Sequence, residues 1–329
     1  MKFRIAAVLF IVAVAFTVYS NSLGGEFSWD DEYFIVKNPY VRNPLNIKAF
    51  FTDPSAAAFG DLAGDVYRPL TVFSFSLDYA LFRLNTFGYH SVNLLFHTLN
   101  AILVFLIFFA VGKDFFVAVF AALYFAAHPV QTEAVSWISG RSNVLFLFFY
   151  LASFWLYIRS RRRGRAALLA LSCVLFAASL FSKEMAVTLP LVIIIYDAYF
   201  GKRSPLVNKL GRYLPYTLLA GVFIAARDLV LPRFSQCAWW GDSPYYTFVT
   251  MVKVLGQYIM LLAWPAKLCA YYFVPISVSL VEGPVLLSMA ILSASIAGAV
   301  YLYRRNRTAS FAILWFFATI LPVCNIIPL

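Results

Sequence analysis

Three adjacent carboxylates, Asp30, Asp31 and Glu32, are the residues of this sequence most able to carry chemistry. They follow closely on the first hydrophobic segment of a chain that is 62% hydrophobic and only 12% charged. Charge beside a membrane is costly unless water, a cation or a substrate meets it. Asp30 or Asp31 could act as a general base on an acceptor hydroxyl, or could instead cap a short surface helix. Glu32 fits a solvated neighbour better than a catalyst.

Basic side chains that could bind a phosphate lie farther along the chain. Arg68 could grip a phosphate through paired hydrogen bonds, or could anchor a lipid headgroup. Lys183 could bind one as a point charge, with Glu184 holding it in place. Arg141 could do the same, although it could simply pair with Glu133.

Histidines form a further group of candidates, at the ends of two hydrophobic segments. His90, Asn93, His97 and Asn100 recur at spacings of three, four and three, which places them on one helix face. We expect His97 and Asn100 to hydrogen-bond to other helices and His90 to reach a substrate. His128 and the adjacent polar residues through Glu133 are further substrate-binding candidates.

Metal binding has little support in the spacing of possible ligands. The three adjacent carboxylates could hold a divalent cation, but adjacency alone does not require one. The four cysteines, Cys173, Cys237, Cys269 and Cys324, are widely scattered and show neither a metal-binding spacing nor a disulfide framework. No metal site is therefore predicted, and a divalent cation stays an alternative.

The elements that must position these residues are membrane helices. A mean hydropathy of +0.79 and 34 phenylalanines exceed what a soluble domain can bury. The net charge of +11 does not indicate nucleic-acid binding, because the basic residues fall in short clusters between apolar segments. The composition predicts an all-α polytopic membrane protein with about nine to ten transmembrane helices.

Hydropathy places the candidate helices within a few residues. The segment 247–263 carries Lys253 and Gln257. The predicted topology needs it either not to cross or to cross with a compensating partner, and we expect that it does not cross. The first segment could be a cleaved signal peptide, but Ser20-Asn21-Ser22 is a poor cleavage site and favours a helix. The predicted spans are about 5–20, 89–111, 115–135, 142–159, 165–182, 185–200, 212–230, 285–303 and 310–327.

Clusters of basic residues predict the orientation of these helices. Lys and Arg concentrate on the cytosolic side of membrane proteins. The large loop of about 21–88 then lies outside the cytosol, on the same side as His90, His128, Arg141 and Lys183. We therefore expect one cavity at the outer face that gathers the unusual polar residues. The cytosolic clusters are Arg159 to Arg165, then Lys202, Arg203, Lys209 and Arg212, and finally Arg304, Arg305 and Arg307.

An ordered series of motifs resembles one family over nearly the whole chain. The series is similar to the transmembrane, TPR-containing O-mannosyltransferases and their bacterial relatives, which belong to the GT-C glycosyltransferases. It consists of Trp29-Asp30-Asp31, Tyr67-Arg68-Pro69-Leu70-Thr71, the stretch from Gly88 to His97, the stretch from His128 to Val135, Gly140-Arg141 and Ser182-Lys183-Glu184.

The resemblance implies a GT-C-like helical bundle and an inverting transfer of a mannose-like hexose from a polyprenyl-phosphate donor. The acceptor would be a hydroxyl of a protein or glycan at the extracytoplasmic face. An acidic residue early in the first outer loop is the base in such enzymes, a position matched by Asp30 or Asp31. The resemblance implies that Arg68, Arg141 or Lys183 binds the phosphate of the donor.

The sequence also departs from this family. TPR repeats are absent, and Tyr271-Tyr272 stands where many relatives have an acidic residue before an aromatic one. We expect one GT-C-like transmembrane domain over 1–329, without the C-terminal part of the family domain. The alternatives are a transporter or flippase of an anionic lipid-linked sugar, and an inactive truncated homologue. The expected location is a bacterial inner membrane, or the endoplasmic reticulum of a eukaryote.

Overall fold

The structure is a computed structural model that describes residues 2–64, 66–201, 205–231 and 239–325. These ranges contain helices and turns but no strand, which confirms the all-α prediction. The chain divides into two compact units, Met1–Leu189 with Pro205–Pro232, and Pro190–Ser204 with Arg233–Leu329. Lys202, Arg203, Cys237 and the last four residues, all considered above, lie outside the described residues.

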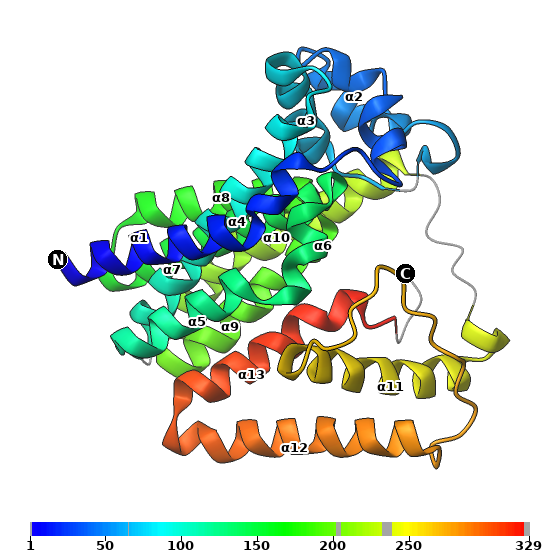
Figure 1. Ribbon diagram of the computed structural model, residues 1–329. Helices are drawn as coiled ribbons and strands as arrows, with labels where there is room; N and C mark the ends of the chain where they lie inside the picture. The colour runs from blue at the N-terminus through cyan, green and yellow to red at the C-terminus, as the bar shows by residue number, and fades with distance from the viewer. Residues whose placement is uncertain (1, 65, 202–204, 232–238, 326–329) are drawn as a thin grey trace. The chain divides into compact units, whose positions relative to one another are not determined.

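Six helices form the bundle of the first unit, and Figure 1 shows their course. α1 packs against α4 and α5 through the small side chains of Ala7, Ala15, Ala118 and Ala122, around Phe105. Small residues let helices approach closely, so α1 is part of the bundle, which favours the membrane-helix alternative for the N-terminal segment. The six helices are α1 Lys2–Tyr19, α4 Thr86–Gly112, α5 Phe115–Ala127, α7 Arg141–Arg163, α8 Ala166–Ser182 and α10 Leu206–Val230.

A break follows α5 where the sequence predicted one continuous helix over 115–135. Pro129 cannot donate a backbone hydrogen bond, and the residue before a proline avoids helical geometry. His128 is accordingly extended, with ψ of 125°, and the chain bends by 47°. The short helices η6 Pro129–Gln131, α6 Thr132–Ser136 and η7 Ile138–Gly140 then lead into α7.

Six helices of the described chain are long and apolar enough to cross a membrane, or seven with the bent pair as one span. This supports a polytopic membrane protein. The nine spans predicted from the sequence comprise five of these six helices, the bent pair and three shorter segments. The sixth helix, Pro244–Ala263, is the segment that was expected not to cross, and it is long and apolar enough to do so. In the structure the three shorter segments are α8 with 17 residues, α9 Leu189–Phe200 with 12 and α13 Arg307–Ile320 with 14. A straight span needs about 20 residues.

The loop between α1 and α4 folds into a compact layer of short helices. Its core lies under α3 and reaches the first turn of α4 at Tyr89 and the loop before α7 at Ile138. Buried Ile35, Val41 and Phe50 join this core, so the predicted outer loop is a packed element. The helices of this layer are η1 Ser20–Gly24, η2 Glu32–Val36, η3 Tyr40–Arg42, α2 Ile47–Thr52, η4 Pro54–Ala56, η5 Gly60–Leu62 and α3 Pro69–Phe82.

The second unit contains α9, α11 Pro244–Ala263, α12 Gly283–Arg305 and α13. Within it, α11 and α12 lie side by side and run in the same direction (Figure 1). Val249 packs with Val285, and Ser288 Oγ donates to Lys253 O at 3.2 Å. The connecting residues 264–282 must therefore return along α11, and Ser277 N donates to Thr250 Oγ1 at 2.9 Å on the way.

Candidate functional site

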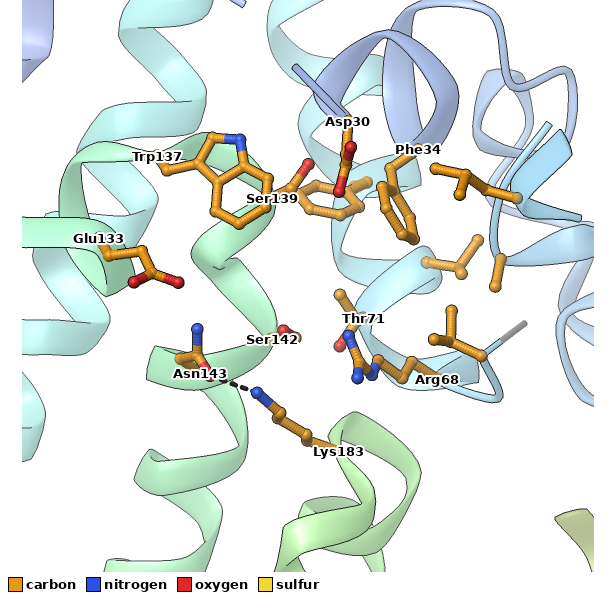
Figure 2. Close-up of a pocket in the computed structure, with 15 residues that line it drawn as sticks. Asp30, Phe34, Arg68, Thr71, Glu133, Trp137, Ser139, Ser142, Asn143 and Lys183 are labelled. Carbon is orange, nitrogen blue, oxygen red and sulfur yellow. Dashed lines mark hydrogen bonds between the residues drawn. The ribbon is translucent and has the colours of Figure 1, made fainter. Parts of the chain in front are cut away.

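A cavity of about 300 Å³ opens in the first unit, between the loop layer and the ends of the long helices. Side chains from four separate stretches of sequence point into it (Figure 2). The loop after α1, the start of α3, the loop and first turn of α7, and the end of α8 each contribute. Its polar lining includes Asp30, Arg68, Glu133, Ser139, Asn143 and Lys183.

Asp30 faces this cavity. Its side chain is half-buried, and within the described residues its carboxylate has no hydrogen bond or ion pair. Its backbone carbonyl accepts from Tyr33 N and Phe34 N, both at 2.9 Å, which fixes the turn. Trp29 before it has φ of 52°, a conformation that is strained for a bulky residue and is often found at functional sites.

Asp31 is not among the residues that line the cavity, and it is fully buried. Its carboxylate accepts from Ser28 N at 2.9 Å, from Ser139 N at 2.8 Å and from Ser139 Oγ at 2.5 Å. Burial raises the pKa of Asp31, although the bonds from Ser139 and Ser28 oppose the shift. Asp31 therefore joins the loop after α1 to the loop before α7, and Asp30 is the one of the two that lines the cavity.

The three adjacent carboxylates do not converge on a common point. Glu32 forms an ion pair with Lys37 at 3.2 Å on the surface, while Asp31 is saturated by the bonds given above. No group of three His, Cys, Asp or Glu side chains in the described ranges is placed to hold a metal ion. As folded, Asp30, Asp31 and Glu32 do not fit the divalent-cation alternative.

Arg68 and Glu184 form a two-bonded ion pair at the cavity. Arg68 Nη2 donates to Glu184 Oε1 at 2.7 Å, and Nε donates to Oε2 at 3.2 Å. Burial acts to raise the pKa of Glu184, but the charge and hydrogen bonds of Arg68 outweigh it and lower that pKa to about 2. Glu184 thereby holds Arg68 in place, and Arg68 lines the cavity.

Lys183 lies beside this pair and reaches the cavity from the end of α8. Its Nζ donates to Asn143 Oδ1 at 2.5 Å (Figure 2). Burial and then the charge of Arg68 lower the pKa of Lys183 to about 8, against the opposing charges of Glu184 and Glu133. Two cations thus stand together at one cavity, the arrangement that an anionic group requires.

Arg141 does not reach the cavity, contrary to its predicted role in phosphate binding. Its side chain is fully buried, with Nη2 2.6 Å from Asp78 Oδ2 and 3.0 Å from Tyr89 O. Its Nε donates to Asn93 Oδ1. The possible pairing of Arg141 with Glu133 is also wrong, because Asp78 of α3 takes that place.

Asn93 and its neighbours on α4 hold the loop that carries the cavity wall. Asn93 Nδ2 lies 3.0 Å from Trp137 O and 3.3 Å from the carbonyls of Val135 and Ile138. His97 and Asn100 bond to other helices, through Ala126 O at 3.0 Å and Val144 O at 2.9 Å. Their predicted interhelical role is confirmed.

His90 and His128 lie outside the cavity lining. His90 is buried against Gly25, where an added Cβ would lie 2.9 Å from its Nε2. His128 Nδ1 accepts from Val130 N at 3.3 Å and so caps η6. Both were predicted to bind substrate. Their placement near helix ends was predictable, but the direction of the side chains depends on packing.

Several cavity residues were not assigned a role from sequence. Trp137 and Asn143 flank the predicted Glu133 and Arg141, and Ser139 binds Asp31. The signal that could have found them is the density of polar and aromatic residues in a very short loop between two apolar helices.

Comparison with known proteins assigns the chain to a group of relatives. No family model and no solved structure matches it. It is 30% identical over 276 residues to Protein O-mannosyl-transferase F38B6.6 of Caenorhabditis elegans, covering 80% of this chain and 39% of that protein. It is 32% identical over 254 residues to human Protein O-mannosyl-transferase TMTC3, covering 74% and 25%.

A third relative, mouse Protein O-mannosyl-transferase TMTC1, is 37% identical over 195 residues, which cover 55% of this chain and 21% of that protein. The chain thus spans well under half the length of these curated relatives. The resemblance seen in the motif series extends to overall sequence identity. The chain is a relative of the transmembrane protein O-mannosyl-transferases and lacks TPR repeats in the sequence given.

Proposed function

We propose that the cavity binds a polyprenyl-phosphate-linked hexose and transfers the sugar to a hydroxyl acceptor at the extracytoplasmic membrane face. The observation that carries this proposal is one cavity lined by two cations, Arg68 and Lys183, and by the carboxylate of Asp30, which has no bonding partner among the described residues. The names of the relatives favour mannose as the sugar and a protein as the acceptor.

The proposed reaction is a single displacement at the anomeric carbon. Asp30 takes the proton of the acceptor hydroxyl, whose oxygen forms a bond to that carbon. The bond from the carbon to the phosphate oxygen breaks at the same time, and its electron pair leaves with the polyprenyl phosphate. Arg68 and Lys183 stabilise the charge that develops on the phosphate. Attack opposite to the leaving group inverts the anomeric configuration.

The contacts around the cavity support the residue roles in this proposal. Asp30 is the base, and Arg68 and Lys183 bind the donor phosphate. Glu184 orients Arg68, while Asp31 and Arg141 position the loops on which the cavity is built. The proposed location is the inner membrane of a bacterium, with the endoplasmic reticulum as the alternative in a eukaryote.

A transfer assay with the full chain tests this function. The wild-type protein in vesicles receives polyprenyl-phosphate mannose and a hydroxyl-bearing acceptor peptide, and the glycosylated product is measured. Asp30→Asn should abolish transfer, while Glu32→Gln, a matched change on the same loop outside the cavity, should retain it. Movement of intact donor across sealed vesicles without product would instead identify a transporter, and neither activity would indicate an inactive homologue.

A further inference from the structure

One wall of the cavity remains without a role in the proposed reaction. Trp137, Glu133 and Asn143 come from the loop before α7 and from its first turn, and all three side chains line the cavity (Figure 2). We propose that this wall is the subsite for the sugar ring of the donor, and that it selects an uncharged pyranose with vicinal hydroxyls. The inference rests on the proposed function and extends it to substrate recognition.

Glu133 is the first support for this subsite. Its side chain is exposed at the cavity, and across the described chain its carboxylate has no hydrogen bond or ion pair. An ionised carboxylate only accepts hydrogen bonds, and its two oxygens match two neighbouring hydroxyl donors of a sugar ring. A carboxylate without a local partner at a cavity is suited to a ligand rich in donors.

Charge makes this wall selective. Glu133 is close enough to Lys183 for its charge to oppose the lowering of the pKa of that lysine. A sugar that carries a carboxylate would meet Glu133 as a like charge, which is unfavourable in a partly buried site. The wall should therefore accept a neutral hexose and reject a hexuronic acid, while Arg68 and Lys183 attract the phosphate.

Trp137 supplies a surface of the size of a pyranose ring. Its Nε1 donates to Ser28 O at 3.3 Å, and its ring lies 6.3 Å from that of Trp29 in an edge-to-face arrangement. These two contacts hold the indole at the cavity without help from a ligand. The electron-rich face of an aromatic ring attracts the weakly positive C–H bonds of a sugar, and the rigid side chain loses little entropy on binding.

Asn143 connects the sugar wall to the phosphate cations. Its Oδ1 accepts a hydrogen bond from Lys183 Nζ. The two N–H donors of its amide form no hydrogen bond with another described residue, so they can donate to a ligand. It therefore stands between the cation that would hold the phosphate and the wall that would hold the ring. The order of groups along this part of the cavity matches the order of groups in a phosphate-linked sugar.

Binding measurements on the full chain in nanodiscs test the subsite. The probes are undecaprenyl phosphate without sugar, undecaprenyl-phosphate mannose and the corresponding uronic acid derivative. The wild-type protein should bind the mannosyl lipid about tenfold more tightly than the sugar-free lipid. Glu133→Gln should remove that preference and weaken discrimination against the uronic acid, with an unchanged affinity for the sugar-free lipid.

Matched variants separate the subsite from general effects. Trp137→Phe should retain most of the preference for the mannosyl lipid, whereas Trp137→Leu should lose it. Lys183→Met should weaken binding of all three lipids, and Glu26→Gln, an exposed carboxylate outside the cavity, should change none. Glu133 is exposed, so Glu133→Gln should fold normally even if Trp137→Leu does not.

Two results would overturn the inference in different ways. If the wild-type protein binds none of the three lipids, the proposed function falls and the subsite with it. If it binds them and still prefers the mannosyl lipid after Glu133→Gln, the sugar subsite alone is wrong.

Discussion

Asp30 and Asp31 are identical side chains that the same turn directs into different surroundings. Asp30 meets the cavity, while Asp31 is buried and accepts three hydrogen bonds. A base must reach the proton that it removes, and a buried acceptor with three donors contributes instead to the stability of the loops. Access to the cavity thus supports the proposed role of Asp30 as the base, and burial supports a structural role for Asp31.

Exchange of either carboxylate for its amide distinguishes these tasks. Asp30→Asn should lower the transfer rate by about a hundredfold or more, because general base catalysis contributes that much. Its melting temperature should stay near that of the wild type, since the side chain forms no hydrogen bond or ion pair within the part of the chain that the structure describes. Asp31→Asn should cost about 1–3 kcal/mol, because its amide group cannot accept all three donors. Transfer assays and thermal melts of both variants would check this, and full turnover by Asp30→Asn would refute the assignment.

Lys183 predicts a dependence of donor binding on pH. Its pKa is about 8, below the usual value for lysine. The protonated form that binds phosphate is complete well below pH 8 and is lost as the pH rises through that value. The affinity for undecaprenyl phosphate, measured from pH 6.5 to 9.5, should therefore fall across this range by about tenfold or more above the pKa.

Lys183→Arg is the control for this dependence, because arginine stays charged throughout and should flatten the profile. The titration of Lys183 cannot cause a loss of lipid affinity at high pH by unfolding the protein. Between about pH 8 and the ordinary lysine pKa the unfolded chain binds more protons than the folded chain, so this residue makes stability rise with pH. A wild-type profile that is flat to pH 9.5 would contradict the role of Lys183.

The shape of the cavity depends on how the helices α3, α4 and α7 are held together. Arg141 at the start of α7 bonds to Asp78 of α3, and to Asn93 of α4, which in turn binds the loop carbonyls of Val135 to Ile138. These bonds join α7 to α3 and to α4 over sequence separations of 63 and 48 residues. The cavity wall is therefore positioned by a buried polar network.

Removal of one partner from this network should be costly. Arg141→Met leaves the buried carboxylate of Asp78 without its cation, which costs about 3–5 kcal/mol in comparable sites. Asp78→Leu combined with Arg141→Met removes both charges and should recover part of that loss. Arg163→Met, at the exposed end of the same helix, should leave the melting temperature unchanged. Equal melting temperatures for Arg141→Met and Arg163→Met would exclude the proposed role of the network.

Hydropathy predicts the helices of the whole molecule well and the directions of side chains poorly. The predicted segments 89–111 and 142–159 lie within α4 and α7, because a long apolar helix has one strong signal. Asp30, Arg68, Glu133 and Lys183 were predicted to bind or react, and the structure places all four at the cavity. The sequence could not distinguish Arg141 and the histidines from these four cavity residues. Sequence position predicts the depth of a residue in the membrane, but tertiary packing decides whether its side chain faces a cavity.

The parallel arrangement of α11 and α12 predicts the topology of the second unit. Residues 264–282 return along α11, so the segment before α11 and the segment before α12 end at the same level. Because α11 and α12 begin at the same level, Arg304 and Arg305 at the far end of α12 and Arg307 beyond it stay on the cytosolic side, as the basic clusters require. Single cysteines at Tyr245 and Val281, in a chain without its four native cysteines, should both react with an impermeant maleimide from the extracytoplasmic side. A cysteine at Asn306 should react only after permeabilisation, and labelling of Tyr245→Cys and Val281→Cys from opposite sides would show that α11 crosses without a return.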